Sequence, residues 1–163
     1  MISVEELIHA PKEIVNKKRP EFKLDQRHFR ADLSLKCDTP PLNMTMFLRR
    51  LKDFPEDFSV GIRINTPNPY SESVIVLVRY QGPHGGQSET RSMEDIHNRY
   101  HIHCYSQDDF DHNRKKASLN NKMEAKFNSF EEAICELLEY CNIKDPNGIF
   151  DQEKNTVKQL RFL

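Results

Sequence analysis

The chain is 163 residues long, which is the size of one domain and enough to hold a hydrophobic core without disulfides or metals. Its 24 basic and 25 acidic residues nearly cancel, so no global field draws it to nucleic acid or to an acidic membrane, and any such contact must be local. No long apolar run occurs and acids appear early, which argues against a spanning helix and a secretory leader. We therefore expect a single cytoplasmic domain over residues 1–163 that does not enter a membrane.

The N-terminal segment has the pattern of a short helix. Ser3 and Glu6 have the spacing of a capping box, and apolar residues follow at helical intervals. Pro11 should shorten this helix, because proline lacks the backbone N–H that a helix interior needs. Residues 1–25 are therefore interpreted as a helix and its connector.

Four further segments have the pattern of β-strands. Apolar and polar side chains alternate over residues 29–37 and 58–64, as in strands with one buried face. Residues 44–54 fit a strand or a helix, and we favour the strand. Residues 73–80, SVIVLVRY, are almost continuously apolar and β-branched, which predicts a central strand.

Two more strands are predicted in the second half of the chain. HIHCY at 101–105 reads as a strand, and the alternation over 123–127 is typical of an edge strand. Residues 81–98, between two predicted strands, form a gap that is longer than a compact domain normally leaves without purpose. We therefore expect a working loop in this gap.

The best-specified element is a helix near the C-terminus. Ser129 is its predicted N-cap. The apolar residues of 130–141 recur at helical spacing, which places the glutamates on the solvent-exposed face. Asn142 can close it, and residues 146–163 are interpreted as a tail. Together the elements predict an α+β domain, with one antiparallel or partly mixed sheet of five or six strands and the N- and C-terminal helices packed on one face.

Three histidines are the leading candidates for chemistry. His101 and His103 are two positions apart on a predicted strand, so their side chains share one face. Ile102 and Cys104 are the better core residues, which places both imidazoles on the polar or cleft face. His84 lies in GPHGG directly after a predicted strand, where loops are held firmly and glycines let the backbone approach a ligand.

Such a cluster is compatible with two chemistries and with a third interpretation in which the histidines have no functional role. His101 and His103, with His84 or His97 as a third ligand plus water, form a ligand set for zinc or another divalent ion. Without a metal, one imidazole can act as base and another as acid on a phosphodiester, with Arg79 or loop amides holding the phosphate. In the third, non-functional interpretation, the strand faces solvent and is merely rich in histidine.

Other polar residues are weaker candidates. The acids of 108–111 could add oxygen ligands, but an acidic loop is more often solvated surface. The cations of 114–116 lie beside the histidines in sequence and could guide a polyanion. The four cysteines form no CxxC pair, so we expect buried reduced thiols. Motifs for P-loop, Rossmann, α/β-hydrolase and zincin chemistry are absent from the sequence.

Four segments carry a pattern that goes beyond single residues: FSVGIRI (58–64), VLVRYQGPHG (76–85), HIH (101–103) and FEEAICELLEYCNI (130–143). Together they resemble a family of small uncharacterised bacterial proteins with an RY(N/Q)GxHG segment, a downstream HIH and a C-terminal helix ending in NI. The resemblance covers about residues 45–145, with Gln81 where the family more often has Asn. It implies a toxin-antitoxin or phage-defence setting but defines no activity.

Two functions follow as expectations. The first is a His-dependent, toxin-like nuclease or phosphoesterase that acts on RNA or another phosphodiester. Its site would consist of His84, His101, His103 and Arg79, with a divalent metal as a candidate cofactor. The alternative is a non-catalytic module that binds a protein partner, in the manner of an inhibitor or antitoxin, through its sheet face or its long loop.

Overall fold

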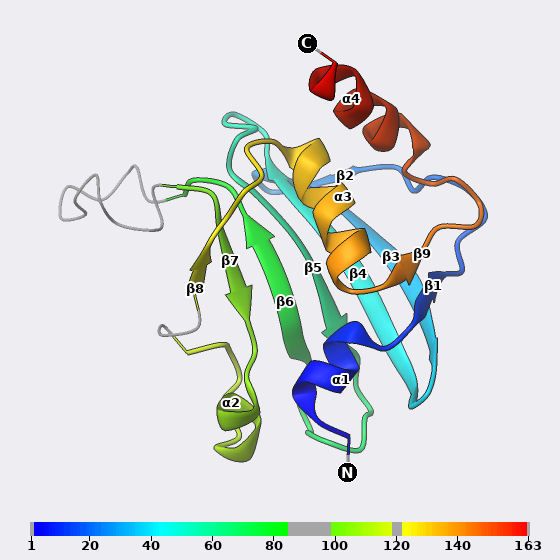
Figure 1. The fold of residues 1–163 in the computed structure, drawn as a ribbon. Coiled ribbons are helices and arrows are strands. Elements are labelled where there is room, and N and C mark those ends of the chain that lie inside the picture. Colours follow the sequence, from blue (N-terminus) through cyan, green and yellow to red (C-terminus); the bar gives the residue numbers. More distant parts are fainter. Residues whose placement is uncertain (1, 85–98, 119–121, 163) are drawn as a thin grey trace, which may run out of the picture.

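The computed structural model describes residues 2–84, 99–118 and 122–162, and Figure 1 shows their fold. In chain order the elements are α1 (Val4–His9), β1 (Lys12–Ile14), β2 (Lys23–Asp25), β3 (His28–Asp38), β4 (Pro41–Leu51), β5 (Phe58–Ile64), β6 (Ile75–Gln81), β7 (His101–Cys104), α2 (Gln107–Asp111), β8 (Lys122–Glu124), α3 (Phe130–Tyr140), β9 (Ile143–Lys144) and α4 (Asp151–Arg161).

The described strands form one curled sheet of nine strands, in the order β8–β7–β6–β5–β4–β3–β1–β9, with β2 paired to β3. Every pairing is antiparallel except that of β1 with β9, which is parallel, so the sheet is mixed. The prediction of five or six strands with both terminal helices packed on one face is therefore wrong. The sequence pattern does not reveal β1, β2 and β9 because strands of two or three residues are too short to show alternation.

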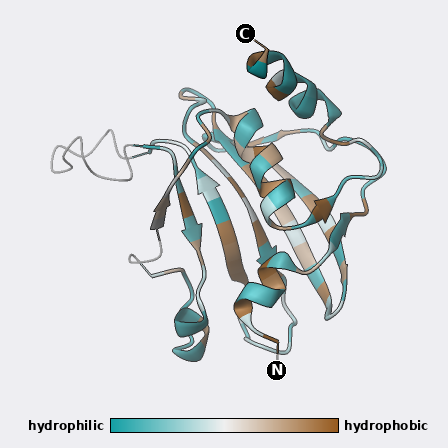
Figure 2. Cartoon of the chain, viewed as in Figure 1, coloured by the Kyte–Doolittle hydropathy of each residue, from teal (hydrophilic) through white to brown (hydrophobic). Residues whose placement is uncertain are grey.

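The helices are few and short, and they differ in what they contact. In Figure 1, α3 lies across β4 and β5, and α1 lies near one end of β6. The C-terminal helix α4, which occupies most of the expected tail, packs against α3 instead of the sheet. It is largely hydrophilic in Figure 2, as expected for a helix at the periphery. Among the described residues, no helix is both long enough and apolar enough to cross a membrane.

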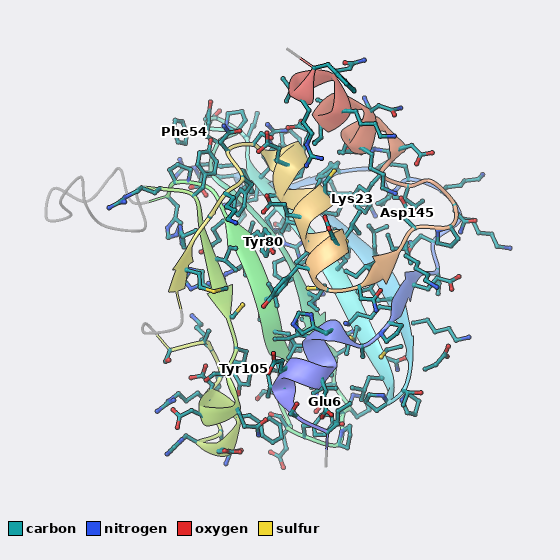
Figure 3. All side chains as sticks on the ribbon, in the orientation of Figure 1. Glu6, Lys23, Phe54, Tyr80, Tyr105 and Asp145 are labelled. Atoms are coloured by element: carbon teal, nitrogen blue, oxygen red, sulfur yellow. The ribbon has the colours of Figure 1, made fainter. Side chains whose placement is uncertain are left out.

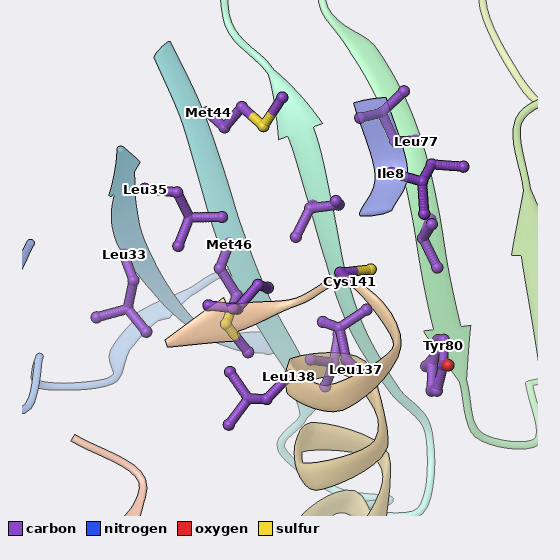
Figure 4. Close-up of a cluster of buried hydrophobic side chains, with 14 of the residues drawn as sticks. Ile8, Leu33, Leu35, Met44, Met46, Leu77, Tyr80, Leu137, Leu138 and Cys141 are labelled. Atoms are coloured by element: carbon purple, nitrogen blue, oxygen red, sulfur yellow. The ribbon is translucent and has the colours of Figure 1, made fainter. Parts of the chain in front are cut away.

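The core lies between the sheet and α3. Ala133, Ile134 and Leu137 on α3 are fully buried, and they face strand residues such as Val60 and Ile62, which are also fully buried. Figure 4 shows the same arrangement for Leu137 and Leu138, whose side chains point toward the strands that carry Met46 and Tyr80. Burial of this apolar stripe is what holds the helix on the sheet.

Several local predictions are confirmed. The capping box of Ser3 and Glu6 opens α1, which ends before Pro11. Ser129 Oγ accepts a hydrogen bond from the backbone N–H of Glu132 at the start of α3, and Asn142 follows its end with a φ of 53°. Residues 28–38 and 58–64 are strands with alternating or nearly alternating burial. All four cysteines are free thiols as predicted, but only Cys37 and Cys141 are buried, whereas Cys104 and Cys135 are partly exposed.

A buried lysine joins the N-terminal elements to the end of α3. The Nζ of Lys12 donates hydrogen bonds to the carbonyl oxygens of Ile8 at 2.6 Å, Ala10 at 2.7 Å and Cys141 at 3.0 Å. Lys12 is only 2% exposed, and its backbone sits opposite Ile143 in the parallel β1–β9 pair. Three carbonyl groups that would otherwise lack donors at helix ends are satisfied in this way.

The sheet face opposite α3 is polar, and we call it the arginine face. Two rows of directly paired residues run across β7, β6, β5, β4 and β3: His101–Gln81–Ser59–Arg49–Arg30 and, two residues along, His103–Arg79–Gly61–Phe47–Asp32. Arg63 extends this face, because it is two positions from Gly61 on β5. Among the described residues, no helix covers these rows.

Gly61 has a specific steric role in the second row. A Cβ at this position would lie 2.5 Å from Cζ of Phe47 and 2.3 Å from the carbonyl oxygen of Val78. The ring of Phe47 therefore lies over the backbone of β5 at Gly61. Any residue larger than glycine at position 61 would collide with this ring. The guanidinium groups of Arg49 and Arg63 lie 5.6 Å and 5.9 Å from the centre of this ring, and both pair with Asp32.

Candidate histidine site

The three predicted histidines come together at one end of the arginine face. His101 and His103 lie on β7, and His84 follows β6 after Gly82 and Pro83. The Nε2 atom of His101 is 3.0 Å from Nε2 of His103 and 3.3 Å from Nε2 of His84. The ring centres of these two pairs are 4.8 Å and 5.1 Å apart. Segments separated by the 85–98 stretch of sequence thus build one cluster.

Burial in the cluster is higher than a solvent-facing strand would have. His101 is fully buried, whereas His84 and His103 are half-buried. Ile102 and Cys104 pack against the core on the other side of β7, as predicted. The interpretation of solvent-facing histidines is therefore wrong for His101. The imidazoles of His84 and His103 are the partly accessible members of the cluster.

A backbone carbonyl sets the proton position on His101. Nδ1 of His101 lies 2.8 Å from the carbonyl oxygen of Arg99. A carbonyl oxygen can only accept, so Nδ1 carries the hydrogen and donates it. In the neutral ring this leaves Nε2 with its lone pair directed toward His84 and His103.

Arg79 and Gln81 are the neighbours of the histidines on β6. Arg79 is paired with His103 and Gln81 with His101 across the β6–β7 ladder, so their side chains lie on the same face as the imidazoles. Burial lowers the pKa of Arg79, and its Nε has no hydrogen-bond partner among the described residues. A half-buried cation with an unused donor beside the histidines is suited to an anionic ligand.

Gln81 connects the cluster to the rest of its row. Its Nε2 donates to Oγ of Ser59 at 3.0 Å, while its buried Oε1 has no partner among the described residues. Sequence reasoning missed Gln81, Ser59 and the arginines of β4 and β5. Alternation does place them on the polar side of their strands, but only the cross-strand register shows that they line up with the histidines.

The three imidazoles could hold a metal ion. Each offers one ring nitrogen, and these atoms all lie within 4.8 Å of one another. No carboxylate belongs to this group among the described residues. His97, the other proposed third ligand, lies outside the described residues.

The acids and cations that follow β7 have structural partners. The segment 107–111 is helix α2, in which Asp109 is completely buried and accepts hydrogen bonds from Ser106, Arg114 and the backbone of Ser118. Arg114 pairs with Asp108 and Asp109. The expectation of a solvated acidic loop is therefore wrong for Asp109. Figure 3 shows the labelled Tyr105 beside α2, at the end of the sheet where these contacts are made.

Comparison with family models, with curated proteins and with solved structures found no match to this chain. The resemblance noted from the sequence therefore stays a prediction.

Proposed function

We propose that the protein hydrolyses phosphodiester bonds at the cluster of His84, His101 and His103. The observation that carries this proposal is the convergence of three Nε2 atoms at 3.0 Å and 3.3 Å at one end of an arginine-lined sheet face. Histidine is the side chain most often used to move protons or to bind a catalytic metal near neutral pH. Arginine is the side chain best matched to phosphate oxygens.

The two rows of the arginine face supply the binding part of the proposal. Arg79 lies directly beside His103 in the second row, where it can hold the phosphate under attack. Further along the first row, a cavity of about 160 Å³ is lined by His28, Arg30, Arg49, Asp57, Phe58 and Ser59, so that it contains two guanidinium groups and one carboxyl group. Neighbouring strands are about 4.8 Å apart, so these arginines are spaced to contact further phosphates of an extended chain.

The reaction would proceed by attack of water on phosphorus. The water oxygen forms the new bond to phosphorus, and the bond to the leaving ester oxygen breaks. One proton leaves the attacking water and one is delivered to the leaving oxygen, so charge is conserved overall. The cluster activates the water, and the guanidinium of Arg79 balances the charge that develops on the phosphoryl oxygens.

The direct test uses untagged full-length protein with labelled single-stranded RNA, duplex DNA and a chromogenic phosphodiester as separate substrates. We expect cleavage of at least one substrate, and a loss of at least about 100-fold in His103→Ala. His112→Ala is the matched control, because His112 is exposed and its Nδ1 contacts Asp108 on α2. Its rate should equal that of the wild type.

Folding must be checked in the same samples by thermal unfolding, since His103 is half-buried. A folded His84→Ala/His103→Ala variant that cleaves at the wild-type rate would refute the proposal. So would a wild-type protein that is inert toward all three substrates in the presence and absence of divalent metals. Recovery of a stoichiometric protein partner from such an inert sample would favour the non-catalytic alternative.

A further inference from the structure

The spacing of the three imidazole nitrogens matches a metal coordination sphere. Zinc binds imidazole nitrogen at about 2.0–2.1 Å in tetrahedral geometry, which places two such ligands about 3.4 Å apart. Nε2 of His101 is 3.0 Å and 3.3 Å from its two neighbours, and the three ligand atoms lie within 4.8 Å of one another. Small rotations of His84 or His103 would close this triangle.

The two contacts of His101 Nε2 within the cluster cannot both be well-aligned hydrogen bonds to a neutral His101 ring. With Nδ1 donating to Arg99, the neutral ring of His101 has a single in-plane lone pair, on Nε2. One lone pair accepts one well-aligned hydrogen bond, yet two imidazole nitrogens approach it at hydrogen-bonding distance. A cation among the three nitrogens uses a lone pair from each ring and removes this conflict.

We propose that His84, His101 and His103 bind one divalent transition-metal ion, with zinc as the best match, through their Nε2 atoms. Three neutral nitrogens favour zinc and its neighbours in the first transition row, whereas magnesium and calcium prefer oxygen. The bond from His101 Nδ1 to the Arg99 carbonyl is the supporting contact that metal-bound histidines usually make. Half-exposure of His84 and His103 leaves a fourth position for water or substrate, as in catalytic zinc sites.

The metal site is independent of the proposed hydrolysis. A role for the ion as the Lewis acid of that reaction rests on the proposed function. The two β7 ligands are held at a fixed separation by the ladders to β6 and β8. His84 closes the site from the segment that directly follows β6. The site is therefore organised by the sheet before an ion arrives, which favours tight binding.

The test is a metal titration of untagged full-length protein that has been stripped with a chelator. We expect one Zn²⁺ per chain by calorimetry, and visible absorption bands typical of four-coordinate Co²⁺ when cobalt replaces zinc. His103→Ala and His84→Ala should each weaken binding at least about 100-fold and abolish the cobalt bands, because loss of a ligand costs more than loss of its supporting contact. His112→Ala should bind like the wild type.

Two ligand variants keep the test decisive, since His84 lies after the end of β6 and outside every strand, so that its replacement spares the sheet. Wild-type binding that is no tighter than binding by a folded His84→Ala variant would overturn the inference. Cleavage that is insensitive to chelation would exclude the metal ion from the reaction while leaving the proposed function standing. Tight metal binding without cleavage of any phosphodiester would support the metal site and contradict the proposed function.

Discussion

Arg79 illustrates how a single residue can be suited to binding and unfavourable for stability. Its side chain is half-buried on β6, burial lowers its pKa, and its Nε makes no hydrogen bond among the described residues. Removing a cation from water without full pairing costs free energy of folding. Residues of this kind are typical of binding sites, where a ligand supplies the missing partner.

We predict that Arg79→Met raises the free energy of unfolding by about 1 kcal/mol and lowers kcat/KM for a phosphodiester by about 100-fold. Methionine keeps much of the aliphatic volume and removes the unsatisfied charge. Denaturant unfolding and initial rates measure the two effects. Arg30→Met, the same substitution at the exposed end of the other row, should change stability by less than about 0.5 kcal/mol. A destabilised Arg79→Met would show that the guanidinium is structural.

At the scale of elements, local patterns predict structure well where an element is long and has one apolar face. Residues 28–38 and helix α3 are in this class, and both form as predicted. Helix α2 could not be predicted, because it has five residues and its fully buried side chain is an acid, Asp109. Only tertiary partners, which the local pattern does not contain, explain that burial.

The candidate site was predictable to a similar extent. The i, i+2 spacing of His101 and His103 and the turn position of His84 point to one cluster, and the structure brings their nitrogens together. The arginine face was not predictable as a unit. Its rows depend on the register of five strands, and a shift of one residue in any pair would turn those side chains to the other face.

The buried carboxylate of α2 leads to a prediction about pH. Burial raises the pKa of Asp109, but hydrogen bonds from Ser106, Arg114 and the backbone of Ser118 outweigh burial and hold this pKa below its usual value. The folded-state pKa is thus lower than the unfolded one, so the stabilisation is fully present above about pH 4 and is lost as pH falls through the folded-state pKa.

We therefore expect Asp109→Asn to lower the free energy of unfolding by about 2 kcal/mol at pH 7. The difference from the wild type should narrow as pH falls below about 4. Asp111→Asn is the control, since Asp111 is exposed on the same helix and accepts a hydrogen bond from the side chain of Gln107. Urea unfolding at several pH values measures the effect. A gap between the two proteins that is constant with pH would contradict this account.

On the scale of the whole molecule, the near-zero net charge conceals an uneven distribution. Arg30, Arg49, Arg63 and Arg79 all lie on the arginine face. Asp32 pairs with Arg49 and Arg63, and Asp25 on β2 pairs with Arg30, so these two carboxylates offset part of the charge of the four arginines. A local field of this kind attracts a polyanion even though the molecule as a whole does not.

We predict that Arg49→Gln/Arg63→Gln weakens binding of single-stranded RNA and reduces the slope of log K against log salt by roughly 1.4, because each single-strand phosphate contact contributes about 0.7. Fluorescence anisotropy at several salt concentrations measures the slope. Lys17→Gln/Lys18→Gln removes the same charge from exposed positions beyond β1, near the other edge of the sheet, and should leave the slope unchanged. Equal losses in both variants would mean that the RNA is not held on the arginine face.

The parallel pairing of β1 with β9 also bears on how the chain folds during its synthesis. β1 leaves the ribosome before the other strands of the sheet, whereas its neighbour β9 and the carbonyl of Cys141 that accepts a hydrogen bond from Lys12 Nζ emerge only after them. Until then β1 has no partner on that side, and we expect a lysine in an unpaired edge strand to discourage pairing with neighbouring nascent chains. Lys12 would thus limit wrong strand pairing during synthesis, and in the folded protein it links α1 and β1 to the end of α3.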